Sequence, residues 1–145
     1  MSLGEFLLSG YKTQRQPDEL LTQVILPPPA RPEARGFYHQ LGRRNALNIT
    51  RQSLSALLAL DTNGCVDYCR LVDGALFSKP QRLPDVERCL IGQRLEHASI
   101  DSACAVLEKL IDAAIGKRWS AAYKQPVFIS MFRDMMAQAK QEFDK

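Results

Sequence analysis

Residues 36–60 read GFYHQLGRRNALNITRQSLSALLAL and contain two strand-like segments joined by a basic bend. Residues 36–44 alternate apolar and polar side chains, and this period of two predicts a half-buried strand. Residues 49–60 end in an apolar run and predict a longer second strand. Side chains at the bend between the two strands are therefore expected to lie at the rim of a core.

The chain after this stretch extends the sheet and then changes to helices. Residues 61–64 read DTNG, which is a strong signal for a tight hairpin turn, and residues 65–73 predict a third strand. Helices are predicted over residues 84–91, over residues 100–115 with Ser99 as the cap, and from Ser120 to about residue 142 with a kink or restart at Pro126. Strands followed by helices indicate an α+β two-layer sandwich, with a three-to-four-stranded antiparallel meander and three helices.

The chain before residue 36 gives weaker signals. Pro17 followed by two acids suits the first turn of a short helix, and Leu20 to Leu26 predicts a strand that ends at a run of three prolines. Residues 1–3 resemble a remnant of an expression vector. Residues 4–145 are expected to form a single domain of a longer polypeptide.

Length and composition are those of an ordinary globular domain. The 145 residues are 46% hydrophobic and 24% charged, which argues against disorder. A net charge of +3 is too small to indicate nucleic-acid binding by itself. No apolar run is long enough for a membrane span, and no signal peptide is recognised, so no membrane contact is expected.

The cysteines indicate a reducing compartment. They lie among apolar or helix-forming residues without a Cys-x-x-Cys pair, which favours reduced thiols in a core over zinc ligands or disulfides. We therefore expect a cytoplasmic protein without a metal site. The four residues are Cys65, Cys69, Cys89 and Cys104.

No catalytic motif is present, and the most informative polar segment is rich in arginine. Residues 31–51 contain five arginines and one acid, and arginine is well suited to bidentate contact with phosphate. A solvated loop, a nucleotide-phosphate contact and an acidic partner surface all remain compatible with this composition. The arginines are Arg31, Arg35, Arg43, Arg44 and Arg51.

The order of several short motifs resembles the C-terminal domain of the flavoprotein component of molybdenum hydroxylases. This family includes xanthine dehydrogenase and the medium subunit of carbon monoxide dehydrogenase. The resemblance covers essentially the whole chain after residue 3. The motifs are Ser9-Gly10-Tyr11-Lys12-Thr13, Pro17-x-Glu19-Leu20-Leu21, Val24-Ile25-Leu26-Pro27, Phe37 followed by Gly42-Arg43-Arg44-x-Ala46-x-Asn48-Ile49, Pro80-x-Arg82, and Arg118-x-Ser120-x-x-Tyr123-Lys124.

The resemblance implies a role next to a flavin. In that family FAD is held mainly by a preceding domain, and the C-terminal domain closes one side of the flavin pocket. It also implies a molybdenum cofactor and 2Fe-2S clusters on partner subunits, from which electrons reach FAD and then an acceptor. This chain alone is expected to bind no FAD and to be inactive.

Four residues are implied as cofactor-binding: Gln40, Arg43, Arg44 and Asn48. Gln40 stands where the family usually has a lysine, and Asn48 stands where it has an aspartate, so two charges near the flavin are absent. A glutamine offers only a neutral donor in place of the ammonium group.

Two further functions remain open at this point. The first is a nucleic-acid or nucleotide-phosphate binding module that uses residues 31–51, although exposed aromatic platforms among the basic residues are absent. The second is a scaffold that docks an iron–sulfur subunit without FAD. If an upstream domain normally covers apolar surface of this chain, the chain alone is also expected to self-associate weakly.

Overall fold

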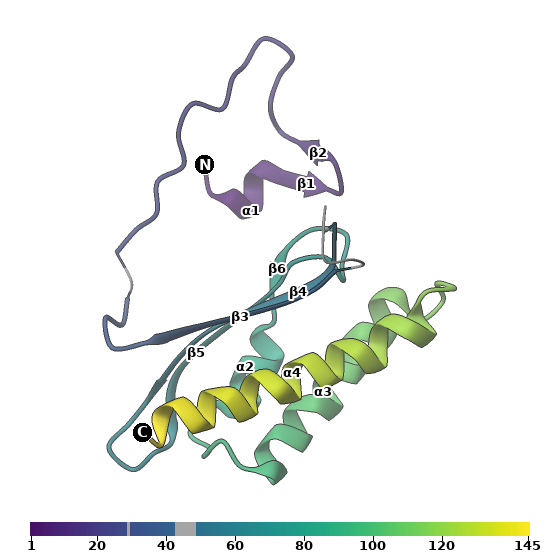
Figure 1. Ribbon diagram of the computed structural model, residues 1–145. Helices are drawn as coiled ribbons and strands as arrows, with labels where there is room; N and C mark the ends of the chain where they lie inside the picture. The colour runs from purple at the N-terminus through teal and green to yellow at the C-terminus, as the bar shows by residue number, and fades with distance from the viewer. Residues whose placement is uncertain (29, 43–48) are drawn as a thin grey trace.

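The computed structural model describes residues 1–28, 30–42 and 49–145. An antiparallel sheet in the order β3-β4-β5-β6 forms its centre, and the helices that follow the sheet in the chain lie on one of its faces (Figure 1). The α+β two-layer sandwich expected from the sequence is confirmed. The main elements are β3 (Arg35–Gly42), β4 (Thr50–Leu60), β5 (Val66–Asp73), β6 (Gln81–Arg82), α2 (Pro84–Leu90), α3 (His97–Ile115) and α4 (Ala121–Phe143).

Strands β3 and β4 bury alternate side chains against the helices. On β4, Leu54, Ala56 and Leu58 are buried in the core, and the residues between them face the opposite side of the sheet. On β3, Phe37 packs against Phe143 of α4, with 6.4 Å between the ring centroids. The alternation predicted for the first segment is thus confirmed over β3, the longer second strand is confirmed as β4, and the end of α4 rests against the start of β3.

The turn between β4 and β5 is built by one carboxylate and one glycine. Asp61 Oδ1 accepts hydrogen bonds from the backbone N–H groups of Asn63 and Cys65 at 2.8 Å and 2.9 Å. Gly64 has a φ of 77°, a conformation that glycine adopts without steric cost, and Asn63 does not share it. A bulge beside this turn pairs Leu60 with Val66 but Ala59 with Tyr68. Val66 therefore faces the core while Tyr68 faces away from it.

Helix α3 begins earlier than its apolar pattern indicates. Its N-cap is Glu96 rather than Ser99, and Ser99 Oγ instead accepts a hydrogen bond from the backbone N–H of Glu96 at 3.2 Å. The expected cap is therefore the third residue of the first turn. The helix starts with residues 97–99, which carry no apolar periodicity. The sequence therefore did not indicate that they belong to the helix.

The sequence predicted a kink or a restart at Pro126, and the restart is wrong because helix α4 runs without interruption through this residue. Ser120 occupies the N-cap position as predicted, but its side chain makes no capping hydrogen bond. Proline lacks the N–H that would bond the carbonyl of Ala122. Both residues are exposed, so water can satisfy that carbonyl and the helix continues.

The N-terminal part of the chain forms little regular structure. A short helix α1 (Leu3–Phe6) leads into the two-stranded hairpin of β1 (Leu7–Ser9) and β2 (Lys12–Thr13). Lys79 Nζ holds this hairpin by donating to the backbone oxygens of Gly4 and Leu7 at 3.0 Å and 2.9 Å.

The segment between this hairpin and β3 carries two incorrect predictions. The sequence predicted a helix after Pro17 and a strand from Leu20 to Leu26, but neither forms. Pro17 lies in a turn closed by a hydrogen bond from Glu19 N to Gln16 O at 3.1 Å. Residues 20–26 pair with no described strand, so their β propensity is not sufficient to form one. Figure 1 shows the segment running clear of the sheet.

Candidate functional site

The predicted cofactor-binding residues divide between described and undescribed parts of the chain. Gln40 lies near the end of β3, on the sheet face that points away from the helices, and it is exposed. Arg43, Arg44 and Asn48 lie outside the described residues. The site is therefore built here from Gln40 and the residues that surround it.

Two hydroxyl groups converge on the side-chain oxygen of Gln40. Tyr38, two residues earlier on the same strand face, donates to Gln40 Oε1 at 3.0 Å. Thr50, the first residue of β4, donates to the same oxygen at 3.4 Å. Tyr38 and Thr50 were not identified as site residues from the sequence, because their contact with Gln40 depends on the strand register.

A groove runs beside Gln40 between the edge strand β3 and helix α4. It has a volume of about 470 Å³. His39 Nε2 lies 2.7 Å from Gln138 Oε1 in a hydrogen bond that joins the strand to the helix. No sequence signal pointed to the helical residues, since they are about 90 positions away along the chain. The lining residues are Tyr38, His39, Gln40, Leu41, Val127, Ser130, Met131 and Asp134.

Behind Gln40, two buried polar side chains hold the segments that adjoin this end of the sheet. Gln52 is fully buried, and its Nε2 donates to the backbone oxygen of Lys124 in α4 at 2.7 Å. Asp73 is also fully buried and accepts from the backbone N–H groups of Leu76 and Phe77 at 2.9 Å and 3.2 Å. These bonds fix the start of α4 and the loop after β5 beside the end of the sheet where Gln40 lies.

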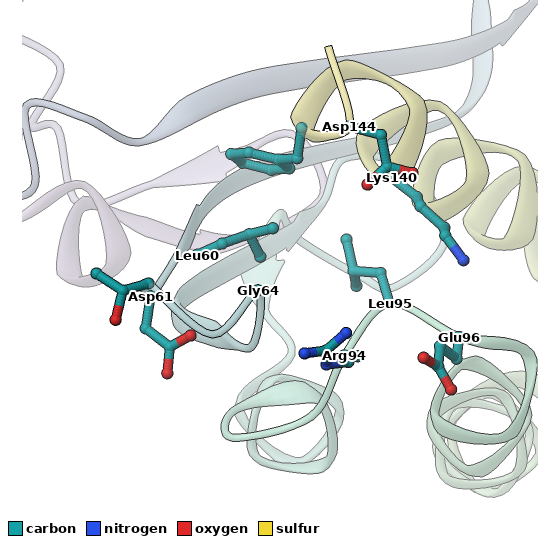
Figure 2. A pocket seen from close by; sticks show the side chains of 10 residues that line it. Leu60, Asp61, Gly64, Arg94, Leu95, Glu96, Lys140 and Asp144 are labelled. Atoms are coloured by element: carbon teal, nitrogen blue, oxygen red, sulfur yellow. The ribbon is translucent and has the colours of Figure 1, made fainter.

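A second cleft lies at the opposite end of the sheet. Thr50 at the start of β4 contacts Gln40, whereas Leu60 at the end of β4 lines this cleft. Figure 2 shows Leu60 and Leu95 lining it, with Arg94 and Lys140 contributed by different elements. Its volume is about 360 Å³. Because an eleven-residue strand separates the two places, this cleft is not part of the site around Gln40.

The sheet face that carries Gln40 is also partly apolar. Tyr38 and Leu57 are 58% and 41% exposed, and both line a shallow groove with Val72 on the next strand. Residues 20–26 expose further large apolar side chains, including Leu20 at 83% and Leu26 at 85%. Exposed apolar surface of this kind is typical of interaction surfaces and ligand-binding grooves.

Of the three arginines of residues 31–51 that the structure describes, two are engaged within the chain. Arg31 forms an ion pair with Asp67, with 2.6 Å between Nη2 and Oδ2. Arg35 stacks over the Phe143 ring at 4.7 Å from its centroid and donates to the backbone oxygen of Glu142. These contacts reduce the basic surface available to an extended phosphate backbone.

The described residues contain neither a metal site nor a membrane span. Within residues 1–28, 30–42 and 49–145, no three His, Cys, Asp or Glu side chains gather as metal ligands. Among the helices of the same ranges, none is both long and apolar enough to cross a bilayer.

Comparison with known proteins identifies a family. The CO dehydrogenase flavoprotein C-terminal domain matches residues 36–139, which begin in β3 and end in α4. The chain is 25% identical over 135 residues to the nicotinate dehydrogenase FAD-subunit of Eubacterium barkeri. That match covers 89% of this chain but 45% of the relative, so the chain spans about half the length of the curated protein it matches.

Two solved structures show the same fold. The reconstituted CO dehydrogenase from Oligotropha carboxidovorans superposes with a TM-score of 0.74 at 22% identity, over 94% of this chain and 47% of the other. The CO dehydrogenase from Hydrogenophaga pseudoflava that lacks the Mo-pyranopterin moiety superposes with a TM-score of 0.71 at 16% identity. This second match covers 92% of this chain and 46% of the other.

Proposed function

This chain belongs to the CO dehydrogenase flavoprotein C-terminal domain family, and we propose that it is the C-terminal part of an FAD-binding subunit of a molybdenum hydroxylase. In this role, residues 4–145 form one domain that closes one side of a flavin pocket. An upstream domain of the same polypeptide supplies the main FAD contacts. The molybdenum cofactor and the 2Fe-2S clusters belong to partner subunits that deliver electrons to FAD.

The observation that carries the proposal is the surface beside Gln40. A polar side chain at the end of β3 adjoins a sheet face with exposed Tyr38 and Leu57. A flavin ring needs hydrogen-bond donors along its polar edge and apolar or aromatic contact on its faces. The described residues fit one wall of such a pocket, and the exposed apolar surface fits contact with a neighbouring domain.

Gln40 would contact the ring, and Arg43, Arg44 and Asn48 are the further cofactor-binding residues that we propose. FAD, when bound, supplies the redox chemistry of the subunit. The chain itself supplies donors and excludes water on one side. A neutral Gln40 stabilises negative charge on the ring less than the lysine usual in the family, because a neutral donor carries no net charge.

The test compares the full-length polypeptide with this chain alone. We expect the full-length protein to copurify with FAD and to show flavin absorbance, and this chain to show none after incubation with FAD and removal of the free FAD. Gln40→Glu in the full-length protein should weaken FAD retention, because it places a carboxylate at the ring. Gln141→Glu, the same change at an exposed position of α4, should not. A full-length protein that retains no flavin absorbance after incubation with FAD and removal of the free FAD would refute the proposal.

A nucleic-acid module is the weaker candidate. Arg31 and Arg35 are occupied by Asp67, Phe143 and Glu142. Filter binding of this chain at two salt concentrations tests it, since phosphate contacts weaken steeply with salt. No binding at low salt is expected.

A further inference from the structure

Among the described residues, the Gln40 carboxamide has hydrogen-bond partners at its oxygen end only. Its Oε1 accepts from Tyr38 Oη at 3.0 Å and from Thr50 Oγ1 at 3.4 Å. Its Nε2 donates to no described residue. A carboxamide oxygen has two lone pairs, so these two hydroxyl groups use its accepting capacity in full.

We propose that Tyr38 and Thr50 are positioning residues that lock the Gln40 carboxamide with Oε1 turned toward them and Nε2 turned outward. Gln40 then acts only as a hydrogen-bond donor toward whatever binds beside it. The identity of that group as a flavin rests on the proposed function. The lock itself is a property of this chain.

The backbone explains why the lock can hold. Tyr38 and Gln40 are two residues apart on one strand, so their side chains project from the same face of the sheet. Thr50 reaches them because Gly42 pairs with Thr50 across a bulge in the β3–β4 register. Thr50 is β-branched and stiff at χ1, so its hydroxyl is held in place at little entropic cost.

The direction of the bonds follows from hydroxyl chemistry. The lone pairs of a phenol oxygen are partly delocalised into the ring, so a phenol donates more readily than it accepts. The carbonyl end of the amide is therefore the better partner for Tyr38. Without the two hydroxyls, the exposed amide could rotate and present either its oxygen or its nitrogen.

The consequence is a constraint on the bound group. A locked Gln40 requires an acceptor, such as a ring carbonyl oxygen or an unprotonated ring nitrogen, and offers nothing to an N–H group. It donates without carrying charge. The lock therefore retains the donor function of the usual lysine without its positive charge.

The first test uses this chain and nuclear magnetic resonance. In the wild type, the Gln40 side-chain NH₂ should be more ordered in ¹⁵N relaxation than that of Gln141, which is exposed and donates to no described residue. In Tyr38→Phe/Thr50→Val, it should become as mobile as Gln141, and the Gln40 Cδ resonance should shift upfield as its oxygen loses two donors. Tyr68→Phe removes another hydroxyl from the same sheet face and should change neither signal.

Two results would overturn the lock. One is a Gln40 NH₂ as mobile as that of Gln141 in the wild type. The other is a double variant in which the Nε2 resonance shifts and the Cδ resonance does not, because the amide would then be donating to the hydroxyls.

The second test uses the full-length polypeptide with FAD bound. Tyr38→Phe/Thr50→Val should lower the flavin reduction potential, since a mobile amide stabilises added electron density on the ring less well, and Tyr68→Phe should leave the potential unchanged. A locked amide with an unchanged potential would overturn its role at the flavin. A full-length protein that binds no FAD would refute the proposed function. The nuclear magnetic resonance spectra of this chain would still show whether Tyr38 and Thr50 hold the Gln40 carboxamide in place.

Discussion

Glu87 of α2 is 3% exposed, and its carboxylate accepts a hydrogen bond from the backbone N–H of Leu71 in β5 at 2.9 Å. The same carboxylate accepts from Arg82 Nε at 3.1 Å, and Arg70 Nη1 lies 3.8 Å away. A buried charge is stable only when it is paired and hydrogen-bonded, and here three groups meet that requirement. This side chain therefore fastens the first helix after the sheet to β5 and β6.

Removing the Glu87 carboxylate should destabilise the domain. Glu87→Ala leaves the Leu71 N–H without a partner, and we expect a loss of about 2–3 kcal/mol in the free energy of unfolding, toward the low end for buried pairs because Arg82 is half-exposed. Glu87→Gln keeps an acceptor and should cost about 1 kcal/mol. Urea unfolding followed by circular dichroism measures both.

The exposed pair of Asp85 and Arg88 on the same helix provides the control. Asp85→Asn should change the free energy of unfolding by less than about 0.5 kcal/mol. Equal losses for the Glu87 and Asp85 variants would contradict the anchoring role.

A buried amide in β4 offers a contrasting case. Gln52 donates to the Lys124 backbone oxygen, but its own Oε1 has no hydrogen-bond partner among the described residues. Gln52→Met fills a similar volume without the unsatisfied oxygen, so we expect stability within about 1 kcal/mol of the wild type, or higher. Gln52→Ala leaves a cavity and should lose about 2 kcal/mol or more. If the Met variant were as unstable as the Ala variant, the hydrogen bond rather than the packing would be essential.

The parts of the fold that the sequence predicts correctly are those with strong local patterns. The alternation around Phe37 and the apolar run that includes Leu54 and Leu58 located β3 and β4 to within one or two residues. Both patterns reflect burial against helices, so local periodicity and tertiary packing agree. The helical pattern from Ser120 onward located α4 for the same reason.

The incorrect predictions arise where tertiary partners decide the outcome. Residues 20–26 have strand propensity but no strand to pair with in the described part of this chain, and propensity without pairing does not make a strand. The bulge at Leu60 places Val66 and Tyr68 on opposite faces of the sheet, although they are two residues apart on one strand. Around the site, Gln40 was identified through family resemblance. Its contacts with Tyr38 and Thr50 depend on a register that no local pattern encodes.

The pH dependence of stability should carry a signature of Asp73. Burial raises the pKa of its carboxyl above the usual value of 3.8, although hydrogen bonds from backbone N–H groups and the charge of Lys124 oppose the shift. Because the pKa of Asp73 is raised in the folded state, its contribution to the free energy of unfolding is fully present below pH 3.8. That contribution declines as the pH rises through the folded-state pKa. The stability of Asp73→Asn relative to wild type should thus improve between about pH 3 and about pH 7. A flat difference in unfolding free energy across that range would contradict the shift.

The thiols should divide into two classes of reactivity. Burial raises the pKa of Cys69 to about 12, and it also raises the pKa of Cys104. Cys65 and Cys89 are only partly buried. Because the thiolate is the reactive form, a disulfide reagent at mildly alkaline pH should titrate Cys65 and Cys89 first and reach all four thiols only on unfolding. Serine variants of the two partly buried cysteines assign the fast phase, and rapid reaction of four thiols in the folded protein would contradict the prediction.

Removing residues 1–34 should leave the fold intact and reduce self-association. The buried core begins at Phe37, and the N-terminal hairpin is held mainly by Lys79, so the deletion removes exposed apolar side chains and almost no core contacts. We expect the free energy of unfolding to change by less than about 1 kcal/mol.

Light scattering at high concentration should show weak dimers for the whole chain and fewer for the shortened one, since exposed apolar surface drives association. Leu20→Ser with Leu26→Ser in the whole chain is the matched test, because it removes apolar surface while keeping the length. A shortened chain that unfolds would show that residues 1–34 make an essential contact. A shortened chain that dimerises as strongly as the whole chain would place the association surface on the sheet.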